Sequence, residues 1–127
     1  MSKYVIDSWV WIEYLEGSDI GRKAKEIIEN EDIFTSMVTV AEVTSKASRM
    51  GKDVNAVFSS IASLSKIIVC GPEFAKEVGV LHSEVKKKIP NFSLGDAFVL
   101  QTAKSHDARV LTGDPDFRGI KEAVMLR

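Results

Sequence analysis

Five acidic residues stand at places in this sequence from which carboxylates could bind a metal ion. They are Asp7, Glu42, Asp96, Asp114 and Asp116. Carboxylate oxygens are the ligands that Mg²⁺ and Mn²⁺ prefer, and these cations keep several waters and bind substrate phosphates. Because the five residues are far apart in the sequence, they can share one site only if the fold brings them together.

Short apolar runs alternate with helical periodicity along the chain. Strands are predicted at 4–6, 33–35, 66–69, 110–112 and 123–126, and helices at 8–16, 18–30, 36–50, 53–64, 72–88 and 93–106. Strands that alternate with helices in this way form a parallel sheet with helices on both faces. The sequence therefore predicts an α/β fold.

The predicted sheet offers one place where the carboxylates can meet. Ligands of such sheets bind beyond the carboxyl ends of the strands, where the strand order reverses. Asp7 follows the first strand, Asp114 follows the fourth, and helix amino termini share that edge. Two carboxylates about 4 Å apart repel by roughly 1 to 4 kcal/mol at effective dielectric constants of about 80 to 20. A cluster would therefore bind protons or a cation.

Four of the five acidic residues also have a purely structural interpretation. Glu42 can pair with Lys46 at the i,i+4 spacing of a solvated helix face. Helix capping would account for three others: Asp7, Asp96 together with Ser93, and Asp114 before Pro115. Capping and ligand binding are compatible, because a helix amino terminus at the sheet's carboxyl edge is where an anionic ligand or its metal would be met.

Four segments, in this order and at this spacing, resemble the PIN domain ribonucleases and, more narrowly, the VapC-like toxins of type II toxin–antitoxin systems. These segments are Tyr4–Ser8, Thr39–Val43, Asp96–Ala103 and Val110–Phe117. The resemblance covers nearly the whole chain. It implies a three-layer α/β/α sandwich with a central, mostly parallel sheet of about five strands.

The resemblance also implies a metal-dependent endoribonuclease that uses Mg²⁺, with Mn²⁺ as a substitute. The implied acidic site comprises Asp7, Glu42, Asp96 and Asp114, with Asp116 similar to a further acidic position. We expect metal contacts from Asp7, Asp96, Asp114 and Asp116. Glu42 is expected to be a second metal ligand or a base that orients the attacking water. Ser8 and Thr112 match supporting hydroxyl positions near such a site.

Substrate binding needs cations, because the site itself is negative. Lys46 and Arg49 follow Glu42 by one and two helical turns, and we expect them to contact RNA phosphates. An ordinary solvated face is the alternative for both, and also for the run 86–88, which stands at a helix end. The aromatic helix 8–16 is expected to pack in the core, with a base-stacking or partner surface as the alternatives.

Several other functions remain to be weighed against the toxin. They are a PIN nuclease of RNA processing, and a PIN-like module that binds RNA or protein without cleaving. His82 and His106 suggest another mechanism, metal-free acid–base catalysis on the ribose 2′-hydroxyl. Both stand late in predicted helices, however, and so away from the carboxyl edge of the sheet. A phosphoacceptor receiver domain would need an aspartate after the middle strand, where Val69–Gly71 stands.

Composition indicates one globular domain, 1–127. The 127 residues carry a net charge of −1, so no general basic field attracts nucleic acid. Cys70 is the only cysteine, and no signal peptide or membrane span is evident, which favours a cytoplasmic protein. As partners, the resemblance implies an RNA substrate, a small antitoxin that covers the acidic site, and a second copy of the chain in a homodimer.

Overall fold

The computed structural model describes residues 2–126, and its strands form one sheet. The strands are β1 (Lys3–Ile6), β2 (Asp32–Ser36), β3 (Lys66–Ile68), β4 (Arg109–Thr112) and β5 (Ala123–Met125). Their order in the sheet is β3-β2-β1-β4-β5, and all four neighbouring pairs are parallel. The five predicted strands are therefore confirmed, and the mostly parallel sheet is parallel throughout the described residues.

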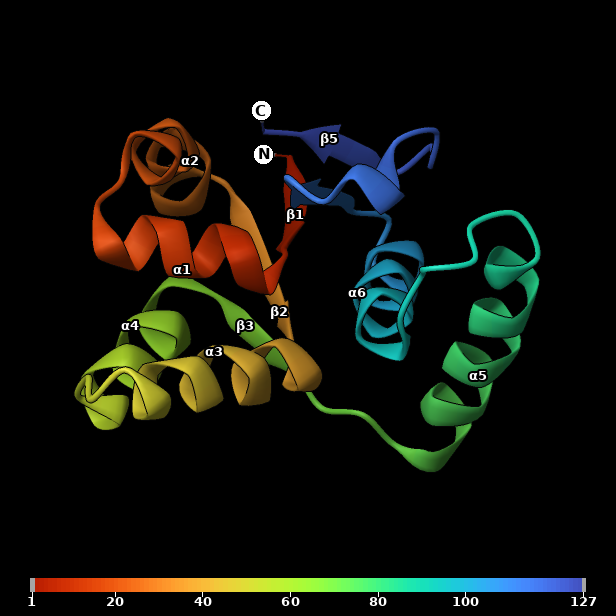
Figure 1. Ribbon diagram of the computed structural model, residues 1–127, viewed down its shortest axis with the longest axis horizontal. Coiled ribbons are helices and arrows are strands. Elements are labelled where there is room, and N and C mark those ends of the chain that lie inside the picture. Colours follow the sequence, from red (N-terminus) through yellow and green to blue (C-terminus); the bar gives the residue numbers. More distant parts are fainter. Residues whose placement is uncertain (1, 127) are drawn as a thin grey trace.

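Helices cover both faces of this sheet. They are α1 (Ser8–Glu16), α2 (Asp19–Asn30), α3 (Met37–Arg49), α4 (Val54–Leu64), α5 (Pro72–Lys86) and α6 (Leu94–Ser105), followed by the short 3₁₀ helix η1 (Pro115–Phe117). Figure 1 shows α1 to α4 on one side of the sheet and α5 and α6 on the other. The predicted α/β/α sandwich is confirmed. Residues 1 and 127, the limits of the predicted domain, lie outside the described residues.

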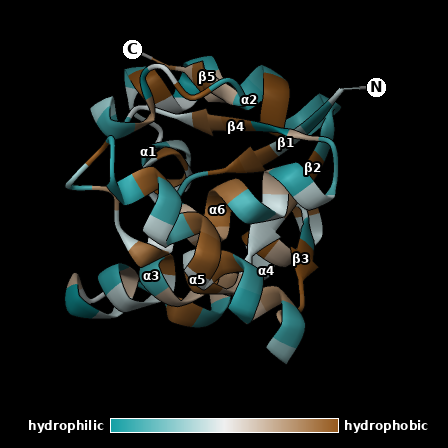
Figure 2. Ribbon diagram, turned by 90° about the vertical axis from the view of Figure 1, so that its right-hand side faces the viewer, coloured by the Kyte–Doolittle hydropathy of each residue, from teal (hydrophilic) through white to brown (hydrophobic). Residues whose placement is uncertain are grey.

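Two hydrophobic cores, one on each face of the sheet, hold the layers together. Successive side chains of a strand point to opposite faces. Val5 and Val110 accordingly pack in the core with α5 and α6, whereas Ile6 and Leu111 pack in the core with α1 to α4. Figure 2 shows β1 and β4 coloured as largely hydrophobic. Burial on both faces fixes these two central strands, and with them the positions of the residues that follow.

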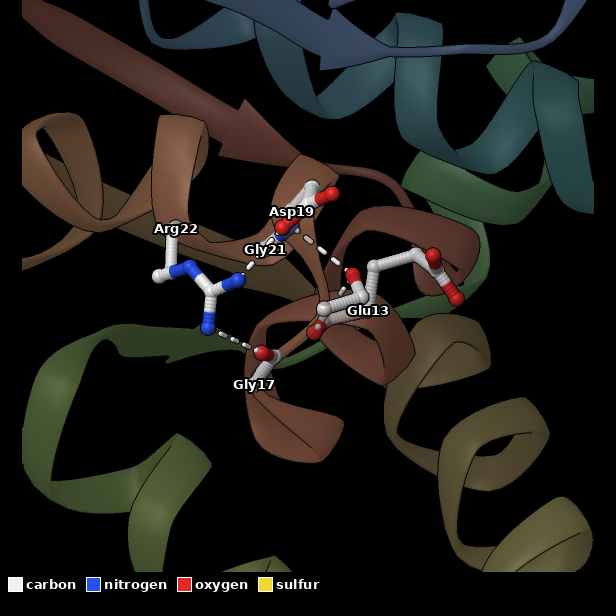
Figure 3. Close-up of polar contacts among 6 residues, drawn as sticks. Glu13, Gly17, Asp19, Gly21 and Arg22 are labelled. Carbon is white, nitrogen blue, oxygen red and sulfur yellow. Dashed lines mark hydrogen bonds and ion pairs between the residues drawn. The ribbon is translucent and has the colours of Figure 1, made fainter.

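The helix that follows β1 is seated by a close contact with α2. A Cβ on Gly21 would lie 2.0 Å from the carbonyl oxygen of Glu13, so the two helices touch backbone to backbone. Ser18 caps α2 by accepting from the Gly21 N–H at 3.0 Å and donates to the Glu13 carbonyl at 3.2 Å. Arg22 donates to the carbonyl of Gly17 at 3.1 Å (Figure 3). These contacts fix the direction of α1.

The element boundaries agree with the predictions to within two residues. The largest difference is at α5, which ends at Lys86 rather than at residue 88. The Lys86 ammonium donates to the carbonyl of Pro90 at 2.6 Å, which satisfies a group in the turn that leads to α6. Among residues 2–126, no helix has the length and apolar character needed to cross a membrane.

Candidate active site

The candidate site lies where the strand order of the sheet reverses. β1 and β4 are neighbours in the sheet although they are far apart in the sequence, because the chain fills one side of β1 before it returns to the other. Asp7 follows β1 directly, and Asp114 comes two residues after the end of β4. The carboxyl ends of these strands are therefore adjacent, as expected for a ligand site of a doubly wound sheet.

Asp7 is the most deeply buried of the five carboxylates, with 7% of its surface exposed. One carboxylate oxygen accepts from the Ser8 N–H at 2.8 Å, and the other accepts from the Thr112 hydroxyl at 2.8 Å. The Thr112 oxygen in turn accepts from the Asp114 N–H at 3.0 Å. Thr112 therefore connects the ends of β1 and β4, which agrees with its predicted supporting position.

Burial dominates the electrostatics of Asp7. It raises the pKa of this carboxyl from 3.8 to about 6, against the lowering effect of the Thr112 hydrogen bond. The negative charges of Asp96 and Asp114 raise the pKa further. Asp7 therefore senses both of these residues through their charge, although it makes no hydrogen bond to either.

Three carboxylates meet at the mouth of the site. One oxygen each from Asp96, Asp114 and Asp116 lies within 4.8 Å of the other two. Asp114 caps η1, because its Oδ1 accepts from the Asp116 N–H at 2.9 Å, and this bond holds the two residues in one tight turn. Asp7, which we predicted as a fourth metal ligand, is outside this group of described residues.

Asp96 reaches the cluster from the amino terminus of α6. It forms the predicted capping box: the Asp96 carboxylate accepts from the Ser93 N–H at 3.0 Å, and the Asp96 N–H donates to the Ser93 hydroxyl at 3.0 Å. Burial raises the pKa of Asp96, the bonds to Ser93 lower it, and the charges of Asp114 and Asp116 raise it again. The net shift is upward, so capping does not offset burial and the crowding of charges.

Glu42 approaches the same place from α3. Its Oε2 lies so close to Gly95 that a Cβ there would be 2.9 Å away. Glu42 is an exposed residue, but partial burial of its carboxyl raises its pKa, a hydrogen bond from the Ser8 hydroxyl lowers it, and the charge of Asp96 raises it. Glu42 and Lys46 form no ion pair in the part of the chain that the structure describes. The structural alternative for Glu42 is therefore not observed.

The five carboxylates suit a hard divalent cation. All the donors are carboxylate oxygens, and none of the ion pairs found within residues 2–126 involves any of the five. The raised pKa values of Asp7, Glu42 and Asp96 reflect burial of negative charge without a compensating cation. A divalent ion such as Mg²⁺ or Mn²⁺ would supply that positive charge.

The predicted cations and histidines are outside this cluster. Lys46 lines a groove between α1, α3 and α4, and Arg49 is exposed near the end of α3. The His82 ring is bonded to the Phe92 carbonyl at 3.0 Å, and the His106 ring to the Thr102 carbonyl at 2.9 Å. Both histidines therefore have structural partners of their own.

The aromatic residues of α1 mainly support the core. Trp11 is fully buried and donates from Nε1 to the Thr35 hydroxyl at 3.2 Å. The Trp9 ring covers Gly113, where a Cβ would come within 2.3 Å of a ring carbon.

Sequence reasoning missed Gly95 and Gly113 as parts of the site. Each directly precedes an acidic residue of the cluster, and this repeated Gly-Asp pair could have indicated a close approach by another group.

Solved structures of other proteins share this fold. A toxin–antitoxin complex from Klebsiella pneumoniae contains a chain 25% identical to this one, with a TM-score of 0.78 and 98% coverage of both chains. VapBC2 from Rickettsia felis, bound to a DNA fragment from its promoter, is 18% identical, with a TM-score of 0.74 over 97% of this chain and 96% of that one. VapC20 of Mycobacterium tuberculosis, a toxin that cleaves the sarcin–ricin loop, is 13% identical, with a TM-score of 0.75 over 94% and 95%.

Sequence comparison supports the same conclusion. No curated protein gives a significant match to the chain. The family model of the PIN domain, however, matches residues 4–123, which include every residue of the acidic cluster. The fold, the switch-point site and this match agree with one another, and the chain belongs to the PIN domain family.

Proposed function

We propose that this protein is a divalent-metal-dependent endoribonuclease and the toxin of a type II toxin–antitoxin pair. The observation that carries the proposal is the meeting of Asp96, Asp114 and Asp116 at the switch point, with Asp7 and Glu42 beside them. Membership of the PIN domain family supports a nuclease. Similarity to VapC20, a toxin that cleaves the sarcin–ricin loop, supports RNA as the substrate.

In this proposal, the aspartates bind the metal and Glu42 handles the proton of the attacking water. Asp96, Asp114 and Asp116 would hold the metal, and Asp7, which feels the charges of Asp96 and Asp114, would contact it directly or through a water. A bound Mg²⁺ or Mn²⁺ would supply Lewis acidity toward water and phosphate oxygens. Glu42, whose carboxylate interacts with the Ser8 hydroxyl, would orient the attacking water and accept its proton. This interaction supports the auxiliary role that the sequence predicts for Ser8.

RNA must be held by groups outside this negative cluster. Lys46 and Arg49 are exposed on α3, one and two turns beyond Glu42. From these positions, the two side chains would bind phosphates that flank the cleaved bond. Contacts with phosphates do not depend on the base sequence of the RNA.

A small antitoxin is the partner that the similar structures suggest, because several of them are toxin–antitoxin complexes. A groove of about 310 Å³ between α1, α3 and α4 begins at the residue after Glu42, and a short antitoxin segment could bind there. Its lining is mainly apolar and also includes Glu16, Lys46 and Lys52. Its apolar residues include Ile12, Leu15, Val43 and Met50.

We also expect the protein to form a homodimer. Light scattering would test this by measuring the mass of the protein in solution.

Cleavage assays test the proposal directly. The purified protein, free of any partner, should cleave single-stranded or loop RNA with Mg²⁺ or Mn²⁺, and EDTA should stop the reaction. Because water is the nucleophile, the products should carry 5′-phosphate and 3′-hydroxyl ends. A 2′,3′-cyclic phosphate would contradict this mechanism. A folded protein that binds RNA but leaves it intact with either metal would identify a non-catalytic module.

The toxin assignment needs a separate test. Expression in a bacterial host should arrest growth, and co-expression of a short reading frame adjacent to the gene should relieve the arrest. A catalytically inactive Asp114→Asn variant is the control, because it should not arrest growth at the same level of protein. Normal growth with active wild-type enzyme would favour a PIN nuclease of RNA processing instead.

A further inference from the structure

The first turn of α6 is in contact with Glu42 at a glycine. Gly95 is the second residue of this helix. It follows Leu94, which is exposed, and precedes Asp96. A Cβ at position 95 would lie 2.9 Å from Glu42 Oε2, 3.6 Å from Glu42 Cδ and 3.6 Å from the Ser93 hydroxyl oxygen. The first of these distances is shorter than real Cβ contacts allow, so the carboxylate occupies space that any side chain would require.

We propose that Gly95 is a positioning residue for the reaction: its lack of a side chain lets the Glu42 carboxylate lie against the amino terminus of α6, beside Asp96. The inference rests on the proposed nuclease function, because it concerns the placement of the group that orients water. The Ser8 hydroxyl, at the first residue of α1, also interacts with the Glu42 carboxylate. The carboxylate is therefore near the amino termini of two helices, where negative charge is favoured.

A side chain at position 95 would displace Glu42 and leave the fold intact. The group in the way is the far end of a flexible side chain, so it can move without moving the backbone. To restore an ordinary contact of about 3.4 Å, the carboxylate would have to retreat by roughly half an ångström. Displacements of about 1 Å in an active site can reduce rates about 100-fold, so a loss of roughly 10-fold is expected from alanine.

Two other glycines can be compared with Gly95. Gly79, in the exposed middle of α5, has nothing within 4 Å of its Cβ direction, so Gly79→Ala is a matched helix substitution without a contact. Gly113 is buried under the Trp9 ring, which cannot move as freely as a glutamate. Of these three glycines, Gly95 alone is next to a movable acidic side chain of the proposed site.

The experiment combines kinetics with thermal melts of Gly95→Ala, Gly79→Ala, Glu42→Ala and the Gly95→Ala/Glu42→Ala double variant. Gly95→Ala should lower kcat about 10-fold with KM within about twofold and Mn²⁺ affinity, measured by calorimetry, within about threefold. Gly79→Ala should leave kcat unchanged and raise Tm by about 2 to 4 °C. On the Glu42→Ala background, Gly95→Ala should cause no further loss of rate.

Melts in EDTA give a readout that does not depend on catalysis. Gly95→Ala should raise Tm more on the Glu42→Ala background than on the wild-type background. Only in a protein that retains Glu42 does the new methyl group displace a carboxylate. An unchanged kcat in Gly95→Ala, or an equal fall in Tm on both backgrounds, would overturn the proposal. If the wild type cleaves no RNA but the melts still show coupling between positions 95 and 42, the placement of Glu42 by Gly95 stands and the nuclease function fails.

Discussion

The buried charge of Asp7 makes a measurable prediction about stability in the absence of metal. Its pKa is about 6 in the folded protein and 3.8 as the reference value, mainly because burial disfavours the ionised form. Above pH 6 the carboxyl is ionised in both states, and the difference of about two pKa units corresponds to a cost of about 3 kcal/mol for the folded state. The substitution Asp7→Asn removes this charge while keeping the shape of the side chain.

The sign of the pH dependence follows from proton linkage. Between pH 3.8 and 6 the folded protein binds more protons at Asp7 than the unfolded chain does, so stability falls as pH rises through this range. Asparagine can accept only one of the two hydrogen bonds that Asp7 now accepts, a loss of about 1 kcal/mol. In EDTA at pH 7.5 the variant should therefore be more stable than the wild type by about 2 kcal/mol.

Denaturant unfolding in EDTA from pH 4 to 8 would measure this difference. The advantage of Asp7→Asn should shrink steadily below pH 6, vanish at about pH 4.5 and reverse below it, while cleavage activity is lost at every pH. Asp53→Asn is the matched control, because Asp53 also caps a helix, by accepting from the Ala56 N–H at 3.1 Å, but is exposed. A loss of stability in Asp7→Asn that is the same at all pH values would refute the reasoning.

Three further predictions follow from the same structure. Asp96→Asn should leave stability in EDTA at neutral pH unchanged or slightly higher, because burial, together with the nearby negative charges, outweighs capping, and should shrink the rise in Tm on adding Mn²⁺; an equal loss of stability with and without Mn²⁺ would identify a cap only. Neutralising Lys46 and Arg49 together should reduce the salt slope of RNA binding by about 1 to 2, as filter binding at several salt concentrations would show. Gly113→Ala should destabilise the protein by about 3 kcal/mol or more in denaturant unfolding, because the Trp9 ring stands where the methyl group would go; a near-neutral result would contradict that packing.

The fold could be predicted from the sequence because the signals for its elements do not conflict. Val5, Ile6, Val110 and Leu111 form continuous apolar pairs in strands that are buried on both faces, and helical periodicity separates these strands. The capping box of Ser93 and Asp96 appears in the sequence as a polar residue followed three positions later by an acid. Local patterns of this kind are sufficient to place elements in order.

The geometry of the site could be predicted only in part. Strand ends and helix starts indicated that the acidic residues converge, but the sequence carries no distance between side chains. Asp114 and Asp116 are only two residues apart, so whether their carboxylates come close together depends on the conformation of one turn. In the structure this turn is η1. The contacts of Gly95 with Glu42 and of Gly113 with Trp9 join segments far apart in the chain, and a single sequence does not identify the partner of either glycine.

Capping explains how these carboxylates are fixed for ligand binding. Asp96 accepts the Ser93 N–H with Oδ2, and Asp114 accepts the Asp116 N–H with Oδ1, so each keeps its other oxygen for a ligand. Asp7 differs, because one oxygen accepts from Ser8 and the other from Thr112. Each carboxylate oxygen has two lone pairs, so Asp7 can hold Thr112 and still face a metal, and its role as a ligand stays a prediction. The hydrogen bonds that offer a structural interpretation of these acids therefore also fix them for ligand binding.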